Sequence, residues 1–294
     1  MSKSKIHPLA VVESGAQIGN NVTVEAYAVI KKDVTLEDDV VVKSHAYIDG
    51  YTTVGEGTKI FPGASIGTKP QALSFRGEHT RINIGRHCEI REFVTINASI
   101  HEGACVEIGD HTMIMTHCHI AHNCQLGSHV IMGNCSHLGG HVVLEDYAIV
   151  GGMTPVHQWV RIGRYAMVGG LSRVSHDVPP YTIGAGIPFK IGGLNLIGLK
   201  RHGFSLETRS ELTKAFRLIY RSKLHYEEAI ARCESDLQPI PEVQHWLRFC
   251  RETKRGLIGL QGVASDLMVP EEAGALQEAA EEEEDLVGTL STQE

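Results

Sequence analysis

The sequence predicts a mainly β chain, a parallel β-helix of hexapeptide repeats, followed by a small C-terminal α-helical domain. The first observation is an aliphatic residue or methionine at every sixth position from Ile6 to Val174, with exceptions only at Ala72, Glu78 and Glu102. This period fits neither the roughly 3.6-residue period of a helix nor the alternation of a half-buried strand. It is typical of a β-helix built from hexapeptide repeats.

The second observation is a small or β-branched residue four positions after most of these aliphatics, as at Ala28, Val34 and Ala46. A narrow prism in which two side chains per hexapeptide point inward requires such residues. Three hexapeptides then make one coil of 18 residues. Gly, Asn and Asp after many aliphatics suit the turns. The alternative, an antiparallel β-sandwich, is disfavoured because its loops vary in length and would break the period.

The repeat is interrupted twice, at about residues 67–83 and 97–107. Loops that interrupt a solenoid without changing its phase are extruded from a corner and commonly carry binding groups. Two consecutive prolines, Pro179 and Pro180, are expected to end the repeat.

Three amphipathic helices are expected after a Gly-rich stretch, where they would cap the open end of the prism. Ser205 is a candidate N-cap of the first, Tyr226 to Cys233 mark the second, and the third begins near Pro241. The expected domains are a β-helical acyltransferase domain over residues 1–190, a helical domain over 191–258 and an acidic tail over 259–294.

The net charge of −8 comes from the C-terminal tail, because residues 262–294 hold ten acidic residues and no Lys or Arg. Such a segment is expected to be disordered. No basic array with interleaved aromatic residues suggests nucleic-acid binding. No apolar run is long enough to span a membrane and no secretory signal is present, so a cytoplasmic protein without stable membrane insertion is expected. The odd number of cysteines, seven, indicates reduced thiols.

Nine of the 17 histidines lie between residues 101 and 157, and the coil length indicates which of them meet. Residues 18 apart stack on successive coils, which places His119 beneath His137 and puts His122, Gly140 and Gln158 in one column. One edge of the prism therefore carries a ladder of imidazoles, to which His117, His141 and His157 lie close. His111 and His129 stack on another side.

These histidines have three interpretations. Turn histidines can simply be solvated. A metal site is the second, since His117, Cys118, His119, His122 and Cys124 are ligand types; the period argues against it, because both thiols fall at inward positions, and no metal is predicted. A zinc held by three histidines across a subunit interface, as in γ-class carbonic anhydrases, stays an alternative with His117 and His122 as ligands.

The third interpretation is general-base catalysis. Imidazole is the side chain best matched to accepting a proton near neutral pH. A backbone N–H beside a glycine on the next coil can stabilise an oxyanion, because no side chain blocks close approach. Acyl transfer to a hydroxyl group needs these two devices.

Five segments make the pattern more specific. Together they resemble the acyl-[acyl-carrier-protein]–UDP-N-acetylglucosamine O-acyltransferases, and the resemblance covers about residues 6 to 258. It implies a left-handed winding and a homotrimer with active sites in clefts between adjacent prisms. The segments are His119-Ile-Ala-His-Asn-Cys124, Gly139-Gly-His141, Gly151-Gly-Met-Thr-Pro-Val-His-Gln158, Asp177-Val-Pro-Pro-Tyr181 and Gly198-Leu-Lys-Arg-His-Gly-Phe204.

The resemblance implies transfer of an (R)-3-hydroxyacyl chain from acyl carrier protein to the 3-hydroxyl of UDP-N-acetylglucosamine, the first step of lipid A biosynthesis. No cofactor is implied beyond the phosphopantetheine of the carrier protein. His122 matches the general base, and the N–H of Gly140 matches the oxyanion donor. Basic residues near the end of the prism are candidates for docking the acidic carrier protein: Arg161, Arg164, Arg173 and Lys190.

Further positions match substrate-binding residues of the family. Asn195 and Arg201 match groups that hold the nucleotide, and Gly170 matches the position that limits acyl length. The remaining candidates line the sugar and acyl positions: Leu73, Asn97, His119, His141, His157 and Gln158.

The chain also departs from the family pattern. Ala72 and Ser74 stand where the family usually has Asp and Lys that contact the acceptor, Asn97 and Asn123 replace a histidine and an aspartate, and His202 replaces an arginine. Asn123 can accept an imidazole N–H but lacks the charge that would raise the pKa of the base. A 3-amino sugar acceptor is therefore an alternative, and a non-catalytic solenoid scaffold is another.

Overall fold

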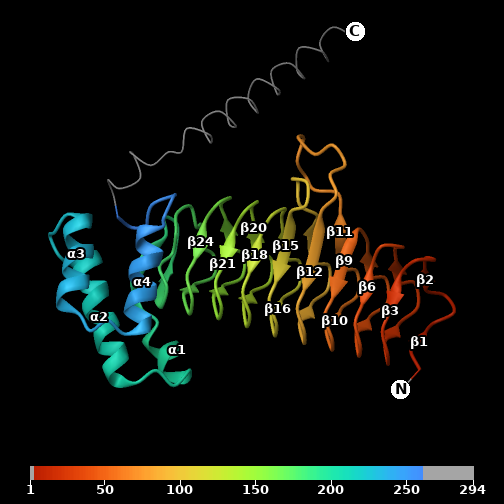
Figure 1. The fold of residues 1–294 in the computed structure, drawn as a ribbon, viewed down its shortest axis with the longest axis horizontal. Helices are drawn as coiled ribbons and strands as arrows, with labels where there is room; N and C mark the ends of the chain where they lie inside the picture. Colours follow the sequence, from red (N-terminus) through yellow and green to blue (C-terminus); the bar gives the residue numbers. More distant parts are fainter. Residues whose placement is uncertain (1–2, 261–294) are drawn as a thin grey trace, which may run out of the picture.

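The computed structural model describes residues 3–260, so the predicted acidic tail lies almost entirely outside the described residues. The chain winds as a parallel β-helix whose strands form three sheets, which confirms the predicted fold class (Figure 1). Sheet A contains β1 (Lys5–Ile6), β4 (Thr23–Val24), β7 (Val41–Val42), β10 (Lys59–Ile60), β13 (Glu89–Ile90), β16 (Met113–Ile114), β19 (Ile131–Met132), β22 (Ile149–Val150), β25 (Met167–Val168), β26 (Thr182–Ala185) and β27 (Lys190–Leu194).

The other two sheets complete each coil. Sheet B contains β2 (Val11–Val12), β5 (Val29–Ile30), β8 (Tyr47–Ile48), β11 (Ser65–Thr68), β14 (Thr95–Asn97), β17 (His119–Ile120), β20 (His137–Leu138) and β23 (Pro155–Val156). Sheet C contains β3 (Gln17–Ile18), β6 (Thr35–Leu36), β9 (Tyr51–Val54), β12 (Arg81–Ile84), β15 (Cys105–Ile108), β18 (Gln125–Leu126), β21 (Val143–Leu144) and β24 (Arg161–Ile162). We name the corners of the prism after the sheets they join: edge AB, edge BC and edge CA.

Both predicted inward positions of the hexapeptide are buried. Ile30 and Ile48 from the six-residue series are 0% exposed, and so are Ala28 and Val34 from the positions four residues later. They belong to one continuous apolar core that runs the length of the prism. The burial of this apolar surface is the main force that holds the coils together.

The turns share a feature that the sequence pattern did not reveal. The third residue after the aliphatic has a positive φ in many hexapeptides, and it is often a large side chain, as at Phe93, His117, His141 and Trp159. Non-glycine residues adopt this region rarely. It directs these side chains outward along the edges, where neighbours from successive coils stack, such as Phe93 on His117 with centroids 5.1 Å apart.

The two interruptions are extruded loops on edge BC, where sheet B passes into sheet C. Tyr51 pairs with Arg81, 30 residues later instead of 18, and Arg81 pairs with Cys105, 24 residues later. The insertions therefore lengthen the coils by two hexapeptides and one hexapeptide, which preserves the phase of the repeat. We call them the first loop (69–80) and the second loop (98–104); Figure 1 shows the first standing out beside β9, β11 and β12.

The C-terminal part differs in two details from the prediction. Pro179 and Pro180 do not end the sheet, because β26 adds to β25 in parallel and β27 returns antiparallel to it. The three predicted helices are present as α2 (Leu206–Arg221), α3 (Tyr226–Asp236) and α4 (Pro241–Arg251). A short α1 (Leu196–Arg201) precedes them and was not predicted. Ser205 caps α2, since its side chain accepts the N–H of Thr208.

The helices gather at the C-terminal end of the prism around a second apolar core that includes Tyr181 and Trp246 (Figure 1). Arg161 of the prism joins them, since its guanidinium lies 3.6 Å from Glu145 and from Glu252 and covers the ring of Phe249. No helix within residues 3–260 is long and apolar enough to cross a membrane. All seven cysteines are free thiols.

Candidate active site

The predicted column of His122, Gly140 and Gln158 lies on edge BC. The coils are held in register by backbone hydrogen bonds, in which His141 N–H donates to His122 O and Trp159 N–H to Gly140 O, both at 3.0 Å. A Cβ at Gly140 would lie 2.3 Å from His122 Cε1, so the imidazole packs directly on the glycine backbone. Only glycine permits this contact.

The N–H of Gly140 points to a possible role for this contact. Within residues 3–260 it has no hydrogen-bond partner, although the neighbouring amides of Gly139 and His141 donate to the adjacent coils. An unpaired backbone donor in a half-enclosed setting is available to a ligand. The column therefore combines an imidazole with a free N–H, which is the pair of devices that acyl transfer needs.

His122 is partly buried and held by its neighbour. Its Nδ1 lies 3.0 Å from Asn123 Oδ1, as the sequence predicted for this pair. Burial lowers the pKa of His122, the hydrogen bond to Asn123 acts in the opposite direction, and nearby His101 lowers the pKa further. The imidazole is therefore neutral, and able to accept a proton, at neutral pH.

Two further predicted histidines surround His122. His119 projects from sheet B, where its Nδ1 lies 2.7 Å from Thr95 Oγ1, and burial lowers its pKa. The ring of His141 meets His122 edge-on at 5.2 Å and stacks on Trp159 at 3.6 Å. Burial lowers the pKa of His141 to about 4. The site is thus a cluster of neutral imidazoles.

The structure places the next three candidates near this cluster. His157 and Gln158 are exposed, and His157 Nδ1 lies 3.1 Å from Gln158 O. Asn97 is buried at the end of β14, where its amide donates to Thr68 Oγ1 at 2.9 Å and to Lys69 O at 3.3 Å. Its Oδ1 has no partner within the described chain, which leaves a buried acceptor beside the first loop.

The remaining candidates lie on other edges of the same chain. Asn195 caps α1, since its side chain accepts the N–H of Gly198 and donates to Tyr165 O on edge CA. Arg201 is exposed at the end of that helix. Gly170 lies on edge AB, where an added Cβ would be 3.1 Å from Gly152 O. One chain therefore does not bring these residues to His122.

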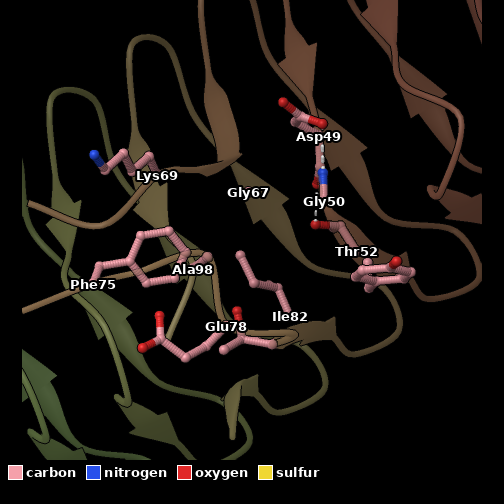
Figure 2. A pocket seen from close by; sticks show the side chains of 11 residues that line it. Asp49, Gly50, Thr52, Gly67, Lys69, Phe75, Glu78, Ile82 and Ala98 are labelled. Carbon is pink, nitrogen blue, oxygen red and sulfur yellow. Dashed lines mark hydrogen bonds between the residues drawn. The ribbon is translucent and has the colours of Figure 1, made fainter. Parts of the chain in front are cut away.

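The first loop covers a pocket of about 240 Å³ on edge BC (Figure 2). Phe75, Ile82 and Ala98 give it an apolar part, and Lys69 and Glu78 supply opposite charges. Leu73 lies outside it and is 67% exposed. The sequence pattern did not identify these lining residues, because they come from segments between which the period fails.

The metal interpretation gains no support from the positions of its ligands. Cys118 and Cys124 are buried in the core, as predicted. His117 stacks on Phe93 on edge AB, whereas His122 lies on edge BC. Within residues 3–260, no three His, Cys, Asp or Glu side chains are grouped so that they could hold a metal ion.

Two family descriptions match parts of the chain. Residues 177–258 match the second domain of UDP-N-acetylglucosamine O-acyltransferase. Residues 15–50 and 105–140 match the bacterial transferase hexapeptide family. These segments are the helical end with its connection to the prism and two stretches of the β-helix.

Similar proteins extend this relationship over most of the chain. The acyl-[acyl-carrier-protein]–UDP-N-acetylglucosamine O-acyltransferase of Chlamydia abortus is 52% identical over 281 residues, which are 95% of this chain and 96% of that protein. Its counterpart in Chlamydia muridarum is 58% identical over 86% of this chain and 91% of that protein. The crystal structure of a UDP-N-acetylglucosamine acyltransferase from Bacteroides fragilis superposes with a TM-score of 0.84 at 36% identity, covering 86% of this chain and 99% of that one. The chain therefore belongs to the acyl-[acyl-carrier-protein]–UDP-N-acetylglucosamine O-acyltransferase family.

Proposed function

We propose that the protein transfers an (R)-3-hydroxyacyl chain from acyl carrier protein to the 3-hydroxyl of UDP-N-acetylglucosamine, the first step of lipid A biosynthesis. The observation that carries this proposal is the contact of His122 with Gly140, where a neutral imidazole lies beside an unpaired N–H. Family membership supplies the two substrates, because the relatives are named for them.

In the proposed reaction His122 Nε2 removes the proton of the sugar 3-hydroxyl as its oxygen attacks the thioester carbon. The carbonyl oxygen becomes negative and accepts a hydrogen bond from Gly140 N–H. The tetrahedral intermediate collapses, the C–S bond breaks, and the proton passes from His122 to the phosphopantetheine thiolate. The products are the 3-O-acyl sugar nucleotide and free carrier protein.

The other residues are proposed to bind substrates from more than one chain. His119, His141, His157 and Gln158 would line the sugar and acyl positions beside His122, and Leu73 and Asn97 would belong to the acceptor side. Arg201 and Asn195 would hold the nucleotide, and Gly170 would limit acyl length. Because the last three lie on other edges, we propose a homotrimer in which a neighbouring prism presents them to edge BC.

Docking of the carrier protein is proposed to use exposed basic residues. Arg173 and Lys190 are exposed and suit an acidic partner. Arg161 is a weaker candidate, because it is already engaged by Glu145 and Glu252. The reaction would take place in the cytoplasm, with no nucleic acid, no stable membrane insertion and no bound cofactor.

A 3-amino sugar nucleotide is a second candidate acceptor, favoured by the uncharged Ala72 and Ser74 in the first loop. Purified protein offered both acceptors with a series of acyl carrier proteins would decide between them. Mass spectrometry of the products distinguishes an ester from an amide and gives the acyl length.

The central test is His122→Ala. A general base contributes about 10²- to 10⁴-fold, so kcat should fall by at least that order. His129→Asn is the matched control, because His129 stacks between His111 and Tyr147 on edge CA, and asparagine tolerates its positive φ. Transfer close to the parental rate by His122→Ala would show that another residue is the base.

A further inference from the structure

The second loop makes two hydrogen bonds to the residue that holds the candidate base. Ile100 N–H donates to Asn123 Oδ1 at 3.2 Å, and Asn123 N–H donates to Ser99 Oγ at 3.2 Å. Ser99 is completely buried, and Asn123 has a φ of 59°. The six residues by which this loop lengthens its coil therefore grip Asn123 from both its backbone and its side chain.

These contacts determine which nitrogen of His122 carries the hydrogen. A backbone N–H can only donate, so the Asn123 atom that faces Ile100 must be the amide oxygen and not the nitrogen. The same oxygen lies 3.0 Å from His122 Nδ1 and can only accept. His122 Nδ1 must therefore be protonated, which leaves the lone pair of the neutral ring on Nε2.

We propose that Asn123 and Ser99 are positioning residues that fix His122 in the Nδ1–H tautomer without placing a negative charge beside it. The inference rests on the proposed function, in which His122 Nε2 is the base. Ser99 acts through Asn123 and touches no reacting atom, so its effect should appear in kcat and not in substrate binding.

The surroundings of His122 make the absence of charge significant. The titratable groups that face it are all imidazoles: His101 from the second loop, His119 from β17 and His141 from the next coil. An aspartate at position 123 would keep both hydrogen bonds and introduce the first carboxylate of this cluster. It would stabilise protonated His122 and so inactivate the base at a higher pH.

The test compares three variants by kcat, KM and the pH dependence of kcat/KM. Asn123→Asp should move the acidic limb of kcat/KM upward by about 1 pH unit or more while keeping kcat within a few fold at high pH. Ser99→Ala should lower kcat by about 3- to 10-fold with KM unchanged, as expected for one lost hydrogen bond. Ser136→Ala, which removes a completely buried hydroxyl far from Asn123 and beside Cys118, should leave both constants unchanged.

A second readout does not depend on activity. Nitrogen NMR of protein labelled in histidine, with the His122 signals assigned by their loss in His122→Gln, should show a protonated Nδ1 and an unprotonated Nε2. In Ser99→Ala the two tautomers should mix. An unmoved acidic limb in Asn123→Asp, or a single Nε2–H tautomer in the parent, overturns the proposal. If the parent transfers no acyl group, the proposed function fails, whereas the tautomer still tests the clamp.

Discussion

At the level of single residues, burial controls the charge of the candidate site. Burial lowers the pKa of His141 to about 4, and neighbouring His122 and His101 act in the same direction. In the unfolded chain its pKa returns to about 6.5. Between these values the unfolded state binds more protons, so the free energy of unfolding rises with pH across this window and falls as pH is lowered through it.

The expected result is a melting temperature that drops as pH is lowered from about 7 to about 4.5, with His119 and His122 contributing in the same direction. His141→Asn should make the curve shallower, because one buried neutral imidazole is removed. The control is His111→Asn at an exposed position that also has a positive φ. Thermal unfolding followed by circular dichroism checks this, and equal slopes for both variants would contradict it.

Gly140 is the residue at which geometry makes the sharpest demand. Its φ is not in the left-handed region, so Gly140→Ala is tolerated by the backbone, but the new Cβ would lie 2.3 Å from the ring of His122. The ring must move away from the oxyanion position, and kcat should fall by about 100-fold. Gly192→Ala is the matched control, since its Cβ would meet only Ile183 O at an ordinary 3.6 Å. An unchanged kcat in Gly140→Ala would exclude the predicted contact.

At the level of elements, the first loop can be separated from the prism because its length is a whole number of repeats. Deleting residues 69–80 joins Thr68 to Arg81 and restores the 18-residue coil between Tyr51 and its partner strand. The shortened protein should fold with a similar melting temperature but lose acceptor binding, seen as a large rise in KM for the sugar nucleotide.

A deletion one residue shorter, 69–79, is the control for this prediction. Removal of eleven residues instead of twelve shifts the register by one, which turns inward side chains of β12 such as Ile82 and Ile84 to the outside. This variant should unfold at a clearly lower temperature or fail to fold. Similar stability of the two deletions would contradict the role of the six-residue phase.

The same elements show what the sequence could reveal. The period identified the inward residues and the column of His122 and Gly140, because stacking follows directly from a coil of constant length. It did not identify the contacts of Ser99 and Ile100 with Asn123, since these depend on the path of a loop that the period does not describe. Nor did it reveal the hairpin of β26 and β27, where glycines conceal strand residues paired through the backbone.

For the whole molecule, the separation of the candidate residues onto different edges predicts that a complete site needs two chains. His122 lies on edge BC, whereas Arg201 adjoins His202, whose ring contacts Tyr147 and Tyr165 on edge CA at 5.0 Å. Residues on different edges of one rigid prism cannot converge on one substrate. A neighbouring copy in a closed oligomer can present one edge to the other.

Mixed oligomers test this arrangement directly. His122→Ala and Arg201→Ala should each lose most activity alone, the first in kcat and the second in KM for the nucleotide. Assembled together in equal amounts, they should recover about a quarter of the parental activity, because that fraction of sites combines an intact His122 with an intact Arg201 from the neighbour. Mixing His122→Ala with Gly140→Ala is the control, since both changes affect the same column and no intact site can form. Absence of recovery in the first mixture would place His122 and Arg201 in separate sites or in one chain.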